Sequence, residues 1–483
     1  MHRRLAFMLL FGLAGCDVRR DAGAVVASVI GERPELKDPA RGGLAGPDRL
    51  LLDSVAEGLV RFDASGQIEP GVAERWTVID GGMSYIFRIR DAAWSDGKPV
   101  TAAEVVAILK RQLARTSRNP LRPFLTAIDE IVEMTPEVIE VRLTRPRPDL
   151  LKLFAQPELA IVRAAPPGGS GPFRIVAAAR GPRLVLRPAP DLEQASDDGD
   201  DTPPPEATVR LIGERAAKAI LRFAHQRSDL VSGGTFADWP LLAQTTIAPA
   251  NVRIDPAAGL FGFAVADRTG FLADPANRAA VARGINRNAI VVAFAPGWAS
   301  TPTILPEQLD SAAPPEVPAW QLGDDAVLSP AERVRQWRQG HPEPLVLRVA
   351  LPAGPGATTL YAQVAAALIR IGIVPQRVGW NEPAALRLVD AVAPYDSARW
   401  YLATACQPCS DIAQAALDAA RDAPTLTERA RHIAEADAAL AADVAYVPVA
   451  QPLRWSLVSL RLKAWTGNSR AWHPLNRLRS DTN

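Results

Sequence analysis

The sequence predicts an α/β protein built from more than one lobe. An apolar run at residues 345–351, an amphipathic pattern at 358–371 and a second apolar segment from Val374 give the strand–helix–strand order of an α/β lobe. The chain has 483 residues, which is too long for one ordinary domain. Its 43 prolines and 33 glycines predict many turns between short elements.

The first sixteen residues predict an export signal. A basic start is followed by a short apolar run at residues 5–13 and by small residues before Cys16. The letters LAGC resemble a bacterial lipobox, in which the cysteine is acylated and tethers a soluble body to lipid. We therefore expect a lipoprotein signal peptide at 1–16, lipidation of Cys16 and a tether at 17–27. The alternative is an ordinary signal peptide with an incidental cysteine.

The charge balance and hydropathy limit the partners of the mature chain. Lys and Arg number 54 against 53 Asp and Glu, whereas nucleic-acid binding usually needs a basic face. No segment after the leader has the roughly 20 apolar residues of a membrane span. We expect no nucleic acid as partner, and contact with the membrane through the lipid anchor only. Asp17 resembles the signal that keeps some lipoproteins at the inner membrane, so we expect a periplasmic protein anchored there.

The N-terminal third predicts two pairs of strands with a capped helix between them. Alternating residues at 78–90 around a DGG turn predict a pair of strands, and residues 128–143 predict two more. Between them, a Ser-Asp-Gly turn precedes a helix that continues to Leu113. Thr101 and Glu104 have the spacing of a capping box, in which each side chain bonds the backbone N–H of the other residue.

Residues that would carry catalysis or bind a metal are not arranged in any familiar pattern. The motifs GxSxG, HExxH, GxxxxGK[ST] and GxGxxG are absent. The four histidines after the leader are far apart, and none has a His or Cys partner at the spacing of metal ligands. We expect no catalytic residues, no metal and no cofactor, and therefore not an enzyme.

Cys406 and Cys409 form a CxxC motif with three interpretations: a redox pair, half of a zinc site, or a local disulfide. No second CxxC exists to complete a zinc site. A redox motif normally sits at a helix N-terminus after a strand, which the sequence leaves open. A structural disulfide is favoured because an exported protein meets an oxidising compartment.

Residues 49–111 contain many separate signals in one order, including EGLVRF, PGVAERW, SYIFRIRDA and WSDGKPVTAAEVV. This order resembles the family 5 extracellular solute-binding proteins of ABC transporters, the oligopeptide, dipeptide and nickel-binding group. The residues that match are Glu57, Gly58, Leu59, Pro70, Ala73, Trp76, Phe87, Arg90, Trp94, Ser95, Asp96, Gly97, Pro99, Ala102, Val105 and Arg111. Further matches at 169–175, 228–231, 278–290 and 425–450 extend the resemblance over nearly the whole mature chain.

The resemblance implies a two-lobed clam, like the type II periplasmic binding proteins, with an extra N-terminal α/β domain. We place lobe I at 28–48, 165–253 and 448–483, the extra domain at 49–164 and lobe II at 254–447. It also implies a monomer that captures a peptide or peptide-like solute by hinge closure between the lobes. The partners it implies are an ABC permease and its ATPase subunits.

The expected ligand contacts are Trp400 and Arg399, with Trp380 and Asn381 on the same lobe. Peptide binders of the family usually carry an Asp three residues after a Trp, where it pairs with the peptide ammonium. Here the third residue after Trp400 is Ala403. Free-N-terminus peptides are therefore one ligand class among several, beside nickel complexes, sugars and opine-like compounds. The alternative functions are a lipoprotein of the same fold that acts as a sensor, chaperone or interaction partner, and an exported hydrolase.

Overall fold

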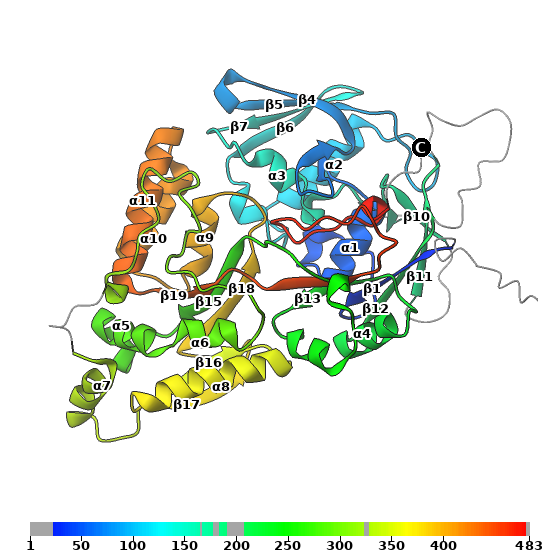
Figure 1. Ribbon diagram of the computed structural model, residues 1–483. Helices are drawn as coiled ribbons and strands as arrows, with labels where there is room; N and C mark the ends of the chain where they lie inside the picture. Colours follow the sequence, from blue (N-terminus) through cyan, green and yellow to red (C-terminus); the bar gives the residue numbers. More distant parts are fainter. Residues whose placement is uncertain (1–22, 165–166, 177–182, 191–206, 323–327, 480–483) are drawn as a thin grey trace, which may run out of the picture.

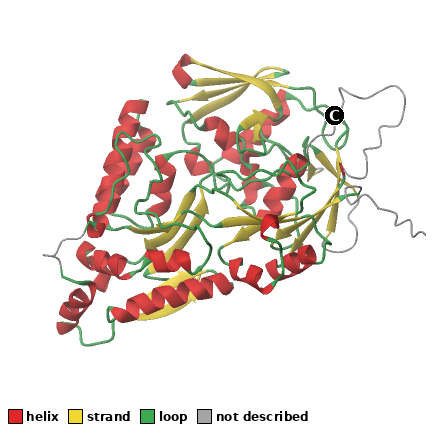
Figure 2. Cartoon of the chain, in the orientation of Figure 1, coloured by secondary structure: helices red, strands yellow, loops and turns green. Residues whose placement is uncertain are grey.

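The computed structural model divides into three units that pack together (Figures 1 and 2). It describes residues 23–164, 167–176, 183–190, 207–322 and 328–479. The expected signal peptide at 1–16, Cys16 and most of the expected tether therefore lie outside the described residues. Two units are built on mixed sheets of seven and five strands, and the third on a four-stranded antiparallel sheet.

Lobe I contains the seven-stranded sheet. Its central strand β1 pairs in parallel with β12 and β13, so that Val25 lies opposite Val209 and Ala27 opposite Leu230. In spatial order the strands are β10 (Phe173–Val176), β11 (Arg183–Pro188), β12 (Val209–Glu214), β1 (Val25–Ile30), β13 (Leu230–Thr235), β20 (Arg454–Val458) and β14 (Val252–Ile254).

The central strands of the lobe I sheet carry buried residues on both faces. Successive residues of a strand point to opposite faces. Leu230 therefore packs in the cluster that contains helix α1 (Gly46–Val55), whereas Val231 packs against helix α4 (Ala216–Ala224) on the other face. On each face of the sheet, segments that are far apart in the sequence therefore pack together.

Lobe II follows the same plan with a five-stranded sheet. Leu260 packs toward helices α9 to α11, and its neighbour Phe261 packs toward helices α5 to α8. The strands in spatial order are β17 (Val374–Gly379), β16 (Val346–Leu351), β18 (Leu386–Val392), β15 (Gly259–Val265) and β19 (Tyr446–Ala450). The helices are α5 (Pro275–Gly284), α6 (Arg287–Val292), α7 (Pro330–Gln339), α8 (Pro355–Arg370), α9 (Ala398–Ala405), α10 (Asp411–Asp422) and α11 (Leu426–Asp443).

The extra domain carries the two predicted strand pairs. Its sheet has the order β4 (Ala73–Ile79), β5 (Ser84–Ile89), β7 (Val138–Leu143) and β6 (Ile128–Thr135). Helices α2 (Ala102–Leu113) and α3 (Leu150–Phe154) pack on it. Two short hairpins complete it and its junction with lobe I: β2 (Val60–Phe62) with β3 (Ile68–Pro70), and β8 (Arg163–Ala164) with β9 (Pro167–Gly168).

Helix α2 begins at the predicted cap, but the cap is not reciprocal. Thr101 Oγ1 accepts a hydrogen bond from the backbone N–H of Glu104 at 3.4 Å. The Glu104 carboxylate instead accepts from the Trp94 indole at 2.9 Å and pairs with Arg163. The acidic side chain therefore joins the helix to the preceding turn and to the end of the domain.

The chain passes between the two large sheets at two places. Residues 255–258 join β14 of lobe I to β15 of lobe II, and residues 451–453 return from β19 to β20. The expected boundaries are corrected in two respects. Val25–Ala27 belong to β1 rather than to a tether, and β19 belongs to lobe II because it pairs with β15 and buries Val447 and Val449 in that core.

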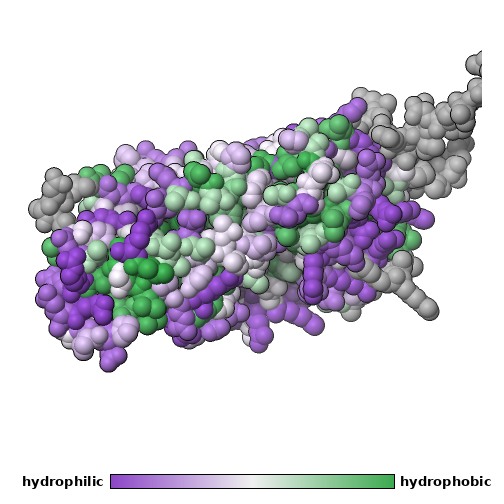
Figure 3. Space-filling model, turned by 60° about the horizontal axis from the view of Figure 1, so that its bottom comes forward, coloured by the Kyte–Doolittle hydropathy of each residue, from purple (hydrophilic) through white to green (hydrophobic). Residues whose placement is uncertain are grey.

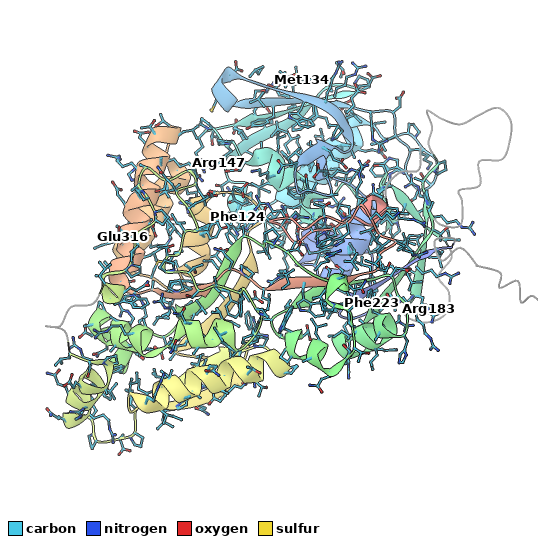
Figure 4. All side chains as sticks on the ribbon, viewed as in Figure 1. Phe124, Met134, Arg147, Arg183, Phe223 and Glu316 are labelled. Atoms are coloured by element: carbon cyan, nitrogen blue, oxygen red, sulfur yellow. A yellow bond between two sulfur atoms is a disulfide. The ribbon has the colours of Figure 1, made fainter. Side chains whose placement is uncertain are left out.

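The extra domain and lobe II share one continuous apolar cluster. Phe124 of the extra domain packs edge-on against Tyr395 of lobe II, with ring centroids 6.0 Å apart (Figure 4). The outer surface that carries α4 and α8 is a mixture of hydrophilic and hydrophobic residues (Figure 3). The extra domain therefore packs directly against lobe II in the interior of the molecule.

Candidate functional site

A cavity of about 640 Å³ lies at the two crossings between the lobes. Residues 254–258 of the first crossing and 451–453 of the second line it together with lobe II residues from 295 to 309. Asp396 and Tyr401 complete the lining. We call it the hinge cavity. Its volume falls in the range of roughly 300–1,000 Å³ that small-molecule sites occupy.

The loop at 295–309 is held in place by β19 and by its own apolar residues. The Thr301 N–H donates to the carbonyl of Val449 at 2.9 Å, and Ser300 forms an isolated bridge with Ala450. Ile304 and Leu305 are buried beyond this point. Prolines in the loop cannot donate to a ladder, which keeps it from extending the sheet. A fixed but irregular segment therefore forms much of the wall.

Trp298 joins this loop to the second crossing. Its indole N–H donates to the carbonyl of Gln451 at 2.8 Å, and its ring packs edge-on against Phe261 and Phe294. The Gln451 side chain accepts from the N–H of Gly259 at 2.8 Å, which ties the two crossings together. Trp298 is only partly buried, so its ring is a flat apolar surface at the cavity.

The hinge cavity is acidic. Three carboxylates line it, those of Asp255, Glu307 and Asp396, and no Lys, Arg or His is among the described lining residues. Asp255 is buried and pairs with His473 at 3.1 Å. The exposed Glu307 has no hydrogen bond or ion pair to its carboxylate within the described parts of the chain. Glu307 is therefore the carboxylate that is available to a bound cation.

Asp396 connects lobe II to both other units. Its carboxylate pairs with Lys152 of the extra domain and with Arg470 near the C-terminus. Burial by itself would raise the pKa of Asp396, but the hydrogen bond from Lys152 and the charge of Arg470 hold that pKa below its ordinary value. Two carbonyls shortly before it also accept from outside lobe II, Pro394 from Gln156 at 2.7 Å and Ala393 from Arg470 at 3.0 Å. These bonds join lobe II to the other two units beside the cavity.

A second closure contact involves the C-terminal end of α10. Arg145 and Arg147 of the extra domain both donate to the carbonyl of Arg421, which is one of the carbonyls without a partner inside the helix (Figure 4). Burial and the neighbouring charges of Arg429, Arg145 and Arg399 lower the pKa of Arg147 to about 10. The two arginines of the extra domain therefore cap the C-terminal end of α10 in lobe II.

The four residues predicted as ligand contacts do not come together at the hinge cavity. Trp400 is 6% exposed and packs into the core beside Tyr401. The Nε of Arg399 donates to the carbonyl of Leu417 at 3.1 Å inside lobe II. Trp380 and Asn381 lie in the turn after β17, and none of the four lines the cavity. Their contact with a ligand stays a prediction.

The CxxC motif lies directly after α9. Cys406 and Cys409 are joined by a disulfide with Cα atoms 4.9 Å apart. Within the ranges that the structure describes, no group of three or more His, Cys, Asp or Glu is arranged to hold a metal ion. No helix in those same ranges has both the length and the apolar character needed to cross a membrane.

Sequence reasoning missed Trp298, Glu307 and Asp396. Trp298 and Glu307 stand in a Pro-rich stretch without periodicity, which gives no sign of which side chains face a cavity. The stretch was nevertheless distinctive, because an irregular segment with a Trp between predicted elements is typical of a functional loop.

Comparison with known proteins gives a consistent result. The model of the bacterial extracellular solute-binding proteins, family 5 Middle, matches residues 67–344. The probable deoxycholate-binding periplasmic protein YgiS of Escherichia coli is 41% identical over 78 residues, 16% of this chain and 14% of that protein. The periplasmic oligopeptide-binding protein OppA of Escherichia coli is 31% identical over 136 residues, 25% of each chain.

The matched segments thus span a quarter or less of these two relatives. The fold is similar over a greater length. The structure of the Escherichia coli murein tripeptide-binding protein MppA superposes with a TM-score of 0.77 at 18% identity, covering 94% of this chain and 98% of MppA. The predicted two-lobed clam with mixed α/β content is therefore confirmed.

Proposed function

Because the chain belongs to the bacterial extracellular solute-binding proteins of family 5, we propose that it captures a peptide or peptide-like solute in the hinge cavity and delivers it to an ABC permease. The observation that carries this proposal is the place of the cavity. Both crossings between the lobes line it, and Asp396 pairs with the opposing units at its edge. Movement of the lobes about those crossings would change the shape of the space around a bound solute.

The charge of the cavity supports a solute with an amino group. Three carboxylates and no cationic side chain surround the space, and Glu307 has no competing partner among the described residues. A ligand ammonium beside Glu307 forms a charge-assisted hydrogen bond, which is stronger than a neutral one. The relatives are named for oligopeptides, a murein tripeptide and deoxycholate. Of these, the peptides carry the cation that this lining favours, whereas deoxycholate is an anion.

The proposed binding mode uses a flat ring and a carboxylate. The Trp298 face would pack against the apolar part of the solute, and Glu307 would hold its ammonium. This replaces the Asp that the family usually places three residues after a Trp, a position held here by Ala403. Side chains of a peptide would occupy the remaining volume with water, so that main-chain groups supply most of the affinity.

We propose a periplasmic monomer with an acylated Cys16, anchored to the inner membrane. The support is the LAGC sequence after a short apolar run and the periplasmic names of the relatives. Replacing Cys16 by Ser should release the protein into the soluble periplasmic fraction, as followed by fractionation and immunoblotting. A variant that stays with the membrane would contradict the anchor.

Thermal unfolding of the purified protein with di- to pentapeptides, opines and nickel chelates tests the function. Ligand at about 100 times Kd should add roughly 2.7 kcal/mol of stability. Peptides with a free N-terminus should stabilise the protein, and their N-acetylated counterparts should do so much less. No shift with any compound would favour a non-transporting partner protein, and cleavage of the peptides would favour a hydrolase.

A further inference from the structure

A second cavity lies on lobe II, on the other side of the loop that walls the hinge cavity. It has a volume of about 540 Å³ and forms where the turn between α5 and α6 meets the end of α8. Seven of its eleven lining residues are polar, and they include Arg283, Arg287 and Arg370. No Asp or Glu is among the described residues that line it. We call it the basic pocket.

The three arginines have no ion-pair partner in the parts of the chain that the structure describes. Arg283 donates to the carbonyl of Leu328 at 2.6 Å, and its Nε is buried without a hydrogen bond. Arg370 is exposed at the end of α8. These two guanidinium groups carry positive charge that nothing in the described lining neutralises.

Arg287 is the fixed member of the set. Its guanidinium donates to the Gln321 side chain at 2.7 Å and to the Thr301 carbonyl at 3.4 Å, and it lies over the Trp320 ring at 5.1 Å. Burial lowers the pKa of Arg287 below its ordinary value. A partly buried cation that contacts only neutral groups lacks a counter-charge. Its guanidinium is already held in position to bind an anion.

The chemistry of the lining identifies the ligand class. Guanidinium groups match carboxylate and phosphate oxygens, which they bind through paired hydrogen bonds. Asn286, Asn288 and Ser300 add neutral hydrogen-bonding groups beside them, although Asn288 already accepts from the Ser300 hydroxyl at 2.6 Å. The volume admits a small organic anion rather than a single ion only.

We propose that the basic pocket is a second binding site, which takes a small organic anion bearing carboxylate or phosphate groups. Pro302 lines both cavities. Thr301 lines the hinge cavity, and its carbonyl accepts a hydrogen bond from Arg287. An anion that binds Arg287 would therefore change a contact of the loop that lines the solute site. Any coupling is reciprocal, so that solute in the hinge cavity changes the affinity for the anion by the same factor.

Calorimetric titration of the whole chain with citrate and with inorganic phosphate tests the site. The wild-type protein should bind one citrate. The double variant Arg283→Gln/Arg370→Gln should bind it at least about tenfold more weakly, which corresponds to about 1.4 kcal/mol. Arg338→Gln, an exposed arginine of α7 on the same lobe, is the matched control and should bind citrate as the wild type does.

Trp320 gives a local readout that a general charge effect does not produce. Citrate should change the tryptophan fluorescence of the wild-type protein but not that of Trp320→Phe, because Arg287 lies over that ring. The proposal is overturned if the wild type binds no citrate, or if Arg338→Gln weakens binding as much as the double variant.

Discussion

The hinge cavity and the basic pocket lie on two sides of one loop and share Pro302, yet their charges are opposite. The hinge cavity has three carboxylates and no cationic side chain among its described lining residues. The basic pocket has three arginines and no carboxylate among its own. The backbone of the loop is common to both, so its course does not decide what each cavity binds. The side chains that neighbouring elements supply decide it.

The two cavities also differ in how their charges are satisfied. Asp396 of the hinge cavity pairs with Lys152 and Arg470, and Asp255 contacts His473, whereas the Glu307 carboxylate has no such partner within the described residues. In the basic pocket the arginines contact carbonyls, an amide and a ring instead. A charge already paired stabilises the closed lobes, whereas an unpaired one favours a ligand of opposite sign.

The largest expected effect comes from removing the ring at the hinge. Trp298→Ala should lower the free energy of unfolding by about 3 kcal/mol, because two aromatic contacts and the bond to Gln451 are lost. It should also abolish solute binding. Urea unfolding and titration measure the two effects. Trp380→Ala, at a residue 39% exposed, is the control for the unfolding measurement alone and should lower the free energy of unfolding by less than about 1 kcal/mol. Equal losses of stability in the two variants would contradict the packing role of Trp298.

Removing the free carboxylate should affect ligand affinity without affecting the fold. Glu307→Gln should weaken binding of an amine-bearing peptide about tenfold and leave its N-acetylated form unchanged. Stability should stay within about 0.5 kcal/mol because the residue is exposed. Glu133→Gln on the extra domain is the matched control, and calorimetric titration is the measurement. Unchanged affinity for the free amine would place the ammonium elsewhere.

Breaking the closure contact should give a smaller effect with a defined pH dependence. Asp396→Asn should lower the free energy of unfolding by about 1 kcal/mol at pH 7. The loss is modest because the carboxylate is partly exposed. The pKa of Asp396 is lowered in the folded protein, so the unfolded chain takes up the proton first as the pH falls. The contribution is therefore full at neutral pH and is lost below about pH 4.

Unfolding of wild type and Asp396→Asn between pH 7 and pH 3 follows this contribution. The difference between the two proteins should be constant down to about pH 5 and should then shrink. A difference that persists at the lowest pH would show that packing, rather than the paired carboxylate, closes the lobes.

The smallest effect is expected at the rim of the basic pocket. Arg370→Gln should change the free energy of unfolding by less than about 0.5 kcal/mol, since the exposed side chain has no ion pair among the described residues. Solute affinity measured without citrate or phosphate should stay within about twofold of the wild type. A large loss of solute affinity under those conditions would mean that the two cavities are one site.

Local sequence patterns were enough to predict several elements and the family. Alternation at 128–143 predicted β6 and β7, and the ordered matches at 49–111 predicted the clam. These features depend on near neighbours in the chain, where periodicity and turn chemistry act directly.

Which side chains face the cavities depends on how the elements pack in three dimensions. In α9 the helix turns Trp400 into the core and places Tyr401 at the hinge cavity, a difference of one residue that its apolar pattern does not reveal. Asp255, Trp298, Glu307 and Asp396 meet there from segments up to about 140 residues apart. Their meeting depends on how the two sheets pack and where the chain crosses between them, because long-range burial and pairing set these positions and local preferences do not.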